Sequence, residues 1–252
     1  MVAGMSERNG YEPGVPCWVD TWRDDPDAVV GFYTQLFGWE AARGEYTLFR
    51  RRRLDVAGLG RRAGTPPAWT TYVWVDDADA TAAKVVAAGG SVVQEPFDSL
   101  DGGRIAIAAD PAGAAFGVWQ LGAHRGAHIV NEPGAWAMSI LSTPEPEGAN
   151  AFYGAVFGWT TQDFGGATMY RLAGYVGGEP EQPVPRDVVA VMVPGEQPAW
   201  TPDFWVPDAD VAAATAQRLG ATVVAPPSDT GAGRTAVLAD PQGAAFTVSQ
   251  VV

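Results

Sequence analysis

The chain contains one sequence pattern twice. The run FYTQLFGW at residues 32–39 returns as FYGAVFGW at 152–159. Three further matches follow in the same order: 69–79 with 200–210, 89–93 with 220–224, and 103–120 with 233–250. Such self-similarity indicates repeated structural units rather than one large domain. We therefore assign an N-terminal tail at 1–12, module 1 at 13–122, a linker at 123–132 and module 2 at 133–252.

The first helix of module 1 is predicted over residues 26–36. Its apolar residues recur at spacings of three and four, as in a helix with one buried stripe: Val29, Phe32, Tyr33 and Leu36. Gly38 follows, at a position where a left-handed residue commonly ends a helix. A second helix is predicted over 78–88, because Asp77 precedes it and a glycine pair follows it.

Short strands rich in β-branched and aromatic residues are predicted around these helices: 17–22, 46–51, 56–60, 70–75, 91–94, 105–109 and 115–119. An Asp-Pro-x-Gly sequence at 110–113, repeated at 240–243, predicts a tight hairpin before the last strand of each module. Each module therefore fits two βαβββ units. The chain as a whole is predicted to be an α+β protein with an internal pseudo-two-fold axis.

The charge balance limits the classes of partner. The chain has 16 Lys and Arg residues against 29 Asp and Glu residues, a net charge of −13. This charge repels phosphate backbones and anionic lipid surfaces, so we expect no nucleic-acid and no membrane partner. Cys17 is the single cysteine, which excludes an internal disulfide and a cysteine-based zinc site. Because residues 1–14 lack a signal-peptide core, we expect a cytoplasmic protein.

The repeated Phe-Tyr-x-x-x-Phe-Gly-Trp sequence and the Asp-Pro-x-Gly hairpin resemble the vicinal oxygen chelate superfamily. That superfamily includes glyoxalase I, bleomycin-resistance proteins, fosfomycin-resistance enzymes and extradiol dioxygenases. The chain looks most like the two-module actinobacterial proteins labelled hydroxylase or glyoxalase-like. The resemblance implies that paired βαβββ units curl around a concave cavity, where the enzymes of the superfamily hold a divalent metal. One fold hosts many activities, so the resemblance implies the fold more strongly than the activity.

The resemblance also implies where metal ligands would stand. In metal-dependent members they are His, Gln or Glu residues on particular strands, and the matching positions here hold Trp18, Thr70 and Gly117 in module 1, and Met138, Thr201 and Thr247 in module 2. None is an ordinary ligand for a hard metal, so we predict no metal and no cofactor. The only histidines, His124 and His128, lie in the linker; two ligands alone make a poor metal site, and we interpret them as solvated.

Strand alternation predicts which side chains face the cavity. In module 1 they are Trp18, Asp20, Trp22, Thr70, Tyr72, Trp74 and Trp119, and in module 2 they are Met138, Ile140, Asp203, Trp205, Thr247 and Ser249. A wall of aromatic and apolar side chains with a few polar groups suits a flat aromatic ligand. The alternative is that the tryptophans fill the cavity and form an ordinary core.

Asp20 is the candidate catalytic residue. An acid between Trp18 and Trp22 on one face of a strand would be partly desolvated, which raises the pKa of its carboxyl and permits general-base chemistry. The structural alternative is a carboxylate that is hydrogen-bonded to its neighbours or paired with an arginine. Asp203 is a weaker second candidate of the same kind.

Our leading hypothesis is a metal-independent small-molecule binder of the glyoxalase and bleomycin-resistance type, with an aromatic or polycyclic ligand held for resistance, sequestration or secondary metabolism. One alternative is an enzyme, a lyase, isomerase or hydroxylase-like catalyst that uses Asp20 or a metal site with other ligands. Another is an interaction protein with closed cavities. Since one chain carries both halves of a site, we expect a monomer or a homodimer.

Overall fold

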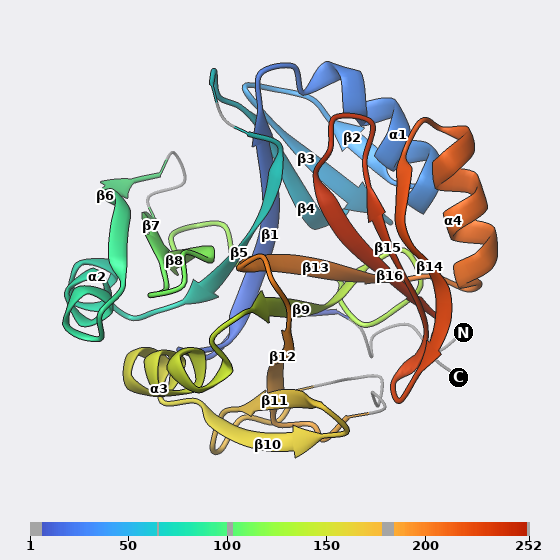
Figure 1. Ribbon diagram of the computed structural model, residues 1–252. Helices are drawn as coiled ribbons and strands as arrows, with labels where there is room; N and C mark the ends of the chain where they lie inside the picture. The colour runs from blue at the N-terminus through green and yellow to red at the C-terminus, as the bar shows by residue number, and fades with distance from the viewer. Residues whose placement is uncertain (1–6, 65, 100–102, 178–183, 251–252) are drawn as a thin grey trace.

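We describe a computed structural model of the chain for residues 7–64, 66–99, 103–177 and 184–250. Two eight-stranded sheets form the core of the molecule, one in each half of the sequence (Figure 1). Their strand orders are β2-β3-β4-β1-β5-β8-β7-β6 and β10-β11-β12-β9-β13-β16-β15-β14. The two orders match position for position, so the chain is two copies of one domain in tandem, and the predicted α+β fold is confirmed.

The first sheet is built from two βαβββ units. The elements are β1 (Pro16–Arg23), α1 (Asp27–Phe37), β2 (Glu40–Ala42), β3 (Tyr46–Arg51), β4 (Leu54–Arg61), β5 (Ala68–Trp74), α2 (Ala78–Ala87), β6 (Ser91–Asp98), β7 (Arg104–Ala109) and β8 (Ala115–Gln120). The predicted helices and strands correspond to these elements to within a few residues at each end. The sequence pattern missed β2, because this three-residue edge strand is largely exposed and has no apolar alternation.

The second sheet repeats the arrangement. Its elements are β9 (Trp136–Thr143), α3 (Pro146–Phe157), β10 (Thr160–Phe164), β11 (Ala167–Arg171), β12 (Val188–Pro194), β13 (Ala199–Trp205), α4 (Ala209–Arg218), β14 (Thr222–Thr230), β15 (Gly233–Ala239) and β16 (Ala245–Gln250). Both sheets fall inside the ranges 13–122 and 133–252. None of the helices in the described ranges has the length and apolar character needed to cross a bilayer.

Local sequence signals set the helix ends. Gly38 and Gly158 end α1 and α3 in the left-handed conformation, with φ of 69° and 74°, as the sequence predicts for Gly38. The Asp77 side chain accepts a hydrogen bond from the Ala80 backbone N–H at 2.8 Å and begins α2. The carboxylate of Asp110 accepts from the N–H groups of Gly113 and Ala114, which fixes the predicted hairpin.

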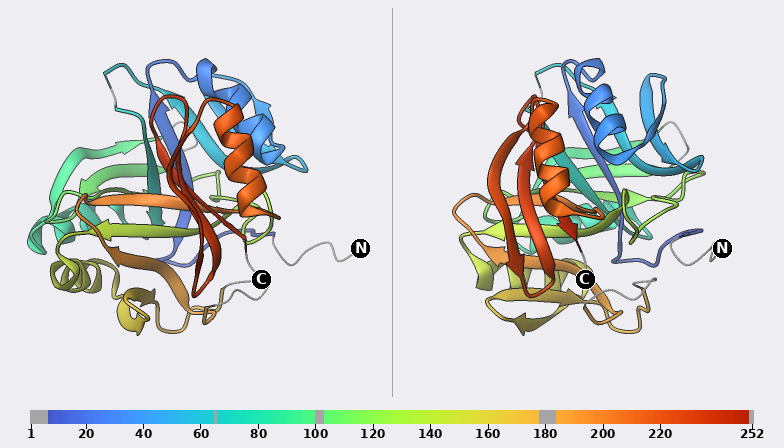
Figure 2. Two further views of the ribbon diagram at one scale, coloured as in Figure 1. Left: turned by 45° about the vertical axis from the view of Figure 1, so that its right-hand side comes forward. Right: turned by 90° about the vertical axis from the view of Figure 1, so that its right-hand side faces the viewer.

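The helix-bearing faces of the two sheets pack against each other. Helix α1 contacts α4, and α2 contacts α3, so each helix meets a helix of the other module (Figure 2). Phe37 of α1 lies 4.9 Å from Phe204 of β13, measured between ring centroids. The hydroxyls of Thr71 and Ser139 share a 2.7 Å hydrogen bond between β5 and β9. The opposite face of each sheet carries no helix, and we call it the inner face.

The linker lies on module 1 instead of crossing solvent. Ala127 and Ile129 are fully buried, and Val130 is nearly so. Backbone hydrogen bonds join Ala127 N to Cys17 O at 2.8 Å and His128 N to Asp55 O at 2.7 Å. The expectation of solvated linker histidines is wrong for His124, whose side chain is 17% exposed. The short sequence 123–132 looked polar because its apolar residues are too few to form a periodic pattern.

Candidate functional site

Strand register collects the predicted site residues on the inner faces. In module 1, Trp18 lies opposite Tyr72, Asp20 opposite Thr70, and Trp74 opposite Trp119. In module 2, Met138 lies opposite Asp203, Ile140 opposite Thr201, Asp203 opposite Thr247, and Trp205 opposite Ser249. Residues directly opposite in a sheet share a face. Every candidate therefore stands on the face that strand alternation assigned to it.

The centre of the inner face of module 1 is filled by its own rings, whereas Trp22, Thr70 and Trp74 are partly exposed. Trp18, Tyr72 and Trp119 are 3%, 4% and 5% exposed. The ring centroid of Trp119 lies 6.4 Å from that of Trp18 and 6.1 Å from that of Tyr72, both in edge-to-face contact. His124 from the linker stacks on Trp119 at 5.3 Å. These rings form a packed floor, which favours the core alternative for this module.

Asp20 lies within this floor. Its Oδ2 accepts hydrogen bonds from Trp22 Nε1 and from the Tyr46 hydroxyl, both at 2.9 Å. Its Oδ1 is buried and has no hydrogen-bond partner among the described residues. Burial raises the pKa of the Asp20 carboxyl to about 7, although the neighbouring polar groups of Tyr46, Tyr72 and Trp22 favour the ionised form. The carboxyl has the pKa of a general base but is surrounded by packed side chains.

The inner face of module 2 carries smaller side chains. At positions that match Trp18, Trp22, Tyr72 and Trp119, module 2 has Met138, Ser142, Asp203 and Ser249. Met138, Ile140, Thr201 and Trp205 are each partly exposed, while Thr247 and Ser249 are buried beneath them. Module 2 therefore offers an apolar face with one aromatic side chain and less bulk than module 1.

Asp203 is the only acidic residue among these inner-face positions of module 2. It is 5% exposed, and its Oδ1 accepts a hydrogen bond from the Ser249 hydroxyl at 2.7 Å. Ser249 in turn shares a 3.2 Å hydrogen bond with Thr235. Burial raises the pKa of the Asp203 carboxyl to about 7, and the hydrogen bond from Ser249 opposes this only in part. Below this pKa the carboxyl is protonated and can donate a hydrogen bond.

The side chains at the family's ligand positions do not fit a divalent metal. A side chain at Gly117 would place its Cβ 2.1 Å from the ring of Tyr72, so the tyrosine occupies the space that a metal-binding side chain at this position would need. Trp18 donates its indole N–H to Tyr46 at 3.0 Å and has no lone pair to offer a metal. Within the described residues, no group of three or more His, Cys, Asp or Glu side chains is arranged to hold a metal ion.

The two histidines converge on Asp55 without forming such a site. His124 Nε2 and His128 Nδ1 lie 3.4 and 3.5 Å from Asp55 Oδ2. The Nδ1 of His124 accepts from the Gly126 N–H at 3.3 Å, which places the ring proton on Nε2 and leaves no lone pair there for a metal. Burial disfavours the Asp55 carboxylate, but hydrogen bonds from His124, His128 and Arg50 hold its pKa below the ordinary value.

Sequence reasoning missed Tyr46 and the linker histidine on the inner face of module 1. Tyr46 was predicted to lie on a strand but was given no role in the site, yet its hydroxyl donates a hydrogen bond to Asp20. Glycines at alternate positions were the available signal: a Cβ at Gly58 or Gly60 would overlap the rings of Tyr46 or Trp22. Alternating glycines on one strand indicate large side chains on its neighbour. No comparable signal marks His124, because stacking on Trp119 depends on the path of the linker.

Comparisons with known proteins agree with this architecture. Residues 18–118 match the model of the glyoxalase/bleomycin resistance protein/dioxygenase superfamily, and residues 138–249 match a glyoxalase-like domain. The chain is 41% identical to CFP32 of Mycobacterium tuberculosis, a protein with the provisional name of glyoxylase, over 97% of both chains. It is 35% identical to the anthracycline biosynthesis protein DnrV of Streptomyces peucetius, over 96% of this chain and 94% of that protein.

Solved structures share the fold at low sequence identity. A Mn(II)-bound glyoxalase from Novosphingobium aromaticivorans aligns with a TM-score of 0.67 at 19% identity, covering 94% of this chain and 82% of that one. The 2,3-dioxygenase LapB from Pseudomonas sp. KL28 aligns with a TM-score of 0.63 at 14% identity, covering 98% and 93%. The family-model matches and the relatives over nearly the full length lead to one conclusion: the chain belongs to the glyoxalase/bleomycin resistance protein/dioxygenase superfamily.

Proposed function

We propose that this protein binds a polycyclic aromatic small molecule on the inner face of module 2, without the divalent metal of the metal-dependent superfamily members. The observation that carries the proposal is the position of Asp203: a buried carboxyl on the same face of the sheet as the partly exposed side chains of Met138, Ile140 and Trp205. A mostly apolar surface with one placed polar group is typical of small-molecule sites.

The asymmetry between the modules supports module 2 as the binding half. In module 1 three of the matching positions hold Trp18, Tyr72 and Trp119, and the ring of Trp119 contacts the other two and His124. Their replacement by Met, Ser and Asp in module 2 removes aromatic bulk while the sheet beneath stays the same. Trp205 and Met138 can contact the faces of a flat ligand, since tryptophan and methionine both pack well on aromatic rings.

Asp203 favours a ligand that carries a hydrogen-bond acceptor. A protonated carboxyl donates a hydrogen bond to a keto or quinone oxygen. Binding would be weaker if the ligand carried an anionic group at the same place. The relative DnrV is named for the biosynthesis of anthracyclines, compounds with fused rings and quinone oxygens. A ligand of that chemical class fits both the apolar face and the acid. The side chains at the ligand positions of both modules support binding without a metal.

Calorimetric titration of the whole protein with 1,4-dihydroxyanthraquinone tests the proposal. The matched variants are Trp205→Ala in module 2 and Trp74→Ala at the same position of module 1. We expect Trp205→Ala to weaken binding about tenfold, equivalent to one aromatic contact of about 1.4 kcal/mol, and Trp74→Ala to leave it unchanged. Affinity should also be the same with and without EDTA.

Three outcomes would overturn the proposal. Absence of binding removes the ligand class. Loss of affinity in Trp74→Ala with none in Trp205→Ala places the site in module 1. Loss of affinity with EDTA, restored by a divalent metal, shows that binding needs the metal.

A further inference from the structure

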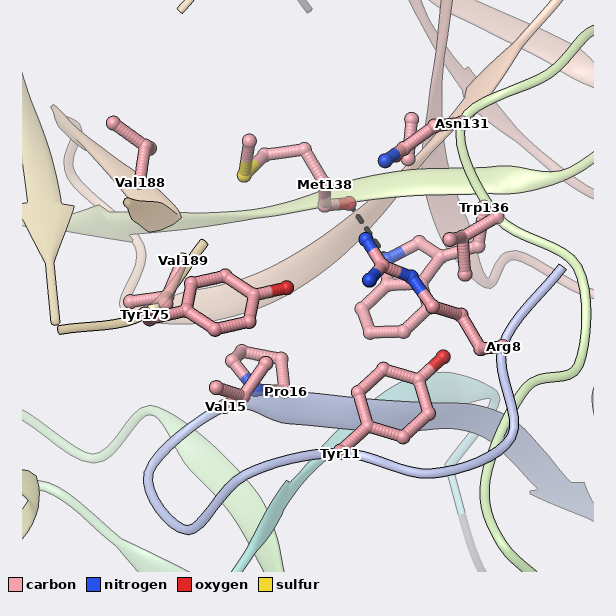
Figure 3. A pocket seen from close by; sticks show the side chains of 12 residues that line it. Arg8, Tyr11, Val15, Pro16, Asn131, Trp136, Met138, Tyr175, Val188 and Val189 are labelled. Atoms are coloured by element: carbon pink, nitrogen blue, oxygen red, sulfur yellow. Dashed lines mark hydrogen bonds between the residues drawn. The ribbon is translucent and has the colours of Figure 1, made fainter. Parts of the chain in front are cut away.

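Buried polar groups in a folded protein normally have a partner. The small cavity between the two modules, about 40 Å³ in volume, is an example (Figure 3). Of the residues around it, Trp136 donates its indole N–H to Met138 O at 2.8 Å, and Tyr11 donates its hydroxyl to Ala127 O at 2.7 Å. The fold itself uses these groups. A buried polar atom without a partner is the exception that needs an explanation.

Oδ1 of Asp20 is such an atom. It is buried and has no hydrogen-bond partner among the described residues, whereas Oδ2 accepts from Trp22 and Tyr46. The Tyr46 hydroxyl in turn accepts from Trp18 Nε1 at 3.0 Å. These hydrogen bonds fix the orientation of the carboxyl through one oxygen. In the described ranges, no arginine, lysine or histidine forms an ion pair with Asp20. The carboxyl therefore lacks both a donor for Oδ1 and a counter-charge.

Module 2 shows that the fold does not need an acid at this place. The strand registers match Asp20, Tyr46 and Gly58 with three apolar residues of module 2: Ile140, Ala167 and Val191. In module 1 a Cβ at Gly58 would overlap the Tyr46 hydroxyl, so the glycine leaves room for the tyrosine that orients the acid. Acid, tyrosine and glycine thus occur together in one module. Because a buried carboxylate without a counter-charge is costly, this set indicates a binding role rather than packing.

Asp20 lies beside a partly exposed rim. Thr70, directly opposite on β5, and Trp22, two residues further along β1, are partly exposed, whereas Trp18 on the other side of Asp20 is 3% exposed. Residues directly opposite in an antiparallel pair have Cβ atoms about 5 Å apart. Tyr46 occupies the β4 side of the carboxyl. On the β5 side, the neighbouring side chain is small and can be reached from solvent.

The partner that suits this site is a cation with several hydrogen-bond donors. An ammonium group brings a positive charge to the carboxylate and has three N–H donors, enough for Oδ1 of Asp20 and the hydroxyl of Thr70. The net charge of −13 attracts cations to the protein. The partly exposed ring of Trp22 can contact the apolar part of the same ligand. A hard divalent metal needs more oxygen ligands than one carboxylate and one hydroxyl provide.

We propose that the inner face of module 1 holds a second small-molecule site, in which Asp20 binds the ammonium group of an organic amine. The ammonium donates to Oδ1 of Asp20 and to the Thr70 hydroxyl, and the apolar part of the amine lies on Trp22. This site is separate from the one proposed on module 2 and takes a different class of ligand, a cation instead of a neutral quinone.

NMR of the tryptophan indole N–H groups of the full chain, titrated with benzylamine and with benzyl alcohol, tests the proposal. The two compounds have nearly the same shape, and only the amine is charged. At pH 8 the Asp20 carboxyl, whose pKa burial raises to about 7, is mostly ionised. The indole of Trp22 donates to Asp20 and reports on the site, and Trp22→Phe identifies its signal. We expect the amine to shift this signal and to bind about tenfold more tightly than the alcohol at low ionic strength.

Asp20→Asn keeps the shape of the side chain and removes its charge. It should lower the affinity for benzylamine to that for benzyl alcohol, and leave the affinity for the alcohol unchanged. Asp163→Asn removes the same charge from an exposed position of β10 and should change neither. Thr70→Val removes one acceptor at a partly exposed position, so the affinity for the amine alone should fall about threefold.

Equal affinities of the wild type for amine and alcohol would overturn the proposal, and so would an Asp20→Asn variant that binds the amine as the wild type does. If neither compound binds, the amine site is wrong as well. Thermal denaturation shows whether Asp20→Asn is folded; if it is not, an unchanged affinity of Thr70→Val for the amine rejects the site. Because 1,4-dihydroxyanthraquinone is titrated separately, the sites of the two modules can fail independently.

Discussion

The hydroxyl of Tyr33 in module 1 donates a 2.6 Å hydrogen bond to Oδ2 of Asp240 in module 2. Tyr33 belongs to the repeated helix sequence and Asp240 to the repeated hairpin sequence. The pseudo-symmetric pair, Tyr153 and Asp110, forms the same contact at 3.1 Å. The two motifs that reveal the repeat therefore form hydrogen bonds between the two modules. Their first role here is structural, and it does not depend on any metal or ligand.

Only one of these two contacts includes a positively charged side chain. Arg23 forms a 2.7 Å ion pair with Asp240, with side chains 1% and 0% exposed, whereas the position equivalent to Arg23 in module 2 is Thr143. Asp240→Asn leaves a buried guanidinium without its counter-charge, and we expect a loss of about 3–5 kcal/mol in the free energy of unfolding. Asp110→Asn weakens one hydrogen bond and should cost about 1 kcal/mol. Urea denaturation of both variants measures the difference, and equal losses would contradict it.

Gly117 should tolerate a side chain only when Tyr72 is removed. A Cβ at this position would lie 2.1 Å from the Tyr72 ring, so Gly117→Ala should destabilise the protein by about 1–3 kcal/mol through overpacking. In a Tyr72→Ala background the same substitution should cost little, because the ring is absent. The double-mutant cycle isolates this coupling. Additive effects would show that the tyrosine does not occupy the space that a metal-binding side chain at this position would need.

The sequence predicted on which face of a strand each side chain lies, but not which side chains it contacts there. Alternation placed Trp18, Asp20 and Trp22 on one face because side-chain direction has a period of two along any strand. Periodicity does not say what each face meets. It could not show that Phe37 packs on Phe204 from the other module, or that the ring of Tyr72 fills the space over Gly117. Those facts depend on module docking and on rotamers, which are properties of the assembled core.

The linker contributes to the stability of module 1 through His124. Both His124 and His128 contact Asp55, at 3.4 and 3.5 Å, but only His124 stacks on Trp119. His124→Ala should therefore destabilise the protein by about 1 kcal/mol more than His128→Ala, the value of one aromatic stack. Thermal denaturation of the two variants, followed by tryptophan fluorescence, provides the measurement. Equal midpoints would mean that the stack adds nothing beyond the contact with Asp55.

The two buried acids should make stability fall as the pH rises. Burial raises the pKa of Asp20 and of Asp203 to about 7, whereas an unfolded aspartate has a pKa of about 3.9. Between these values the folded state binds more protons than the unfolded state, so the free energy of unfolding decreases from about pH 4 to about pH 7 and levels off above. Asparagine at either position should remove part of this decrease.

We expect Asp203→Asn and Asp20→Asn each to be more stable, relative to the wild type, at pH 8 than at pH 4, by a difference on the order of a few kcal/mol. Within the described part of the chain, Asp203 accepts from Ser249 alone, whereas Asp20 accepts from Trp22 and Tyr46, so asparagine should fit more easily at Asp203. Urea denaturation across this pH range measures both slopes, with Asp163→Asn on an exposed position of β10 as the control for a lost surface carboxylate. A slope unchanged in both variants would show that neither carboxyl titrates near neutrality, and the hydrogen-bond donor assigned to Asp203 would then be lost.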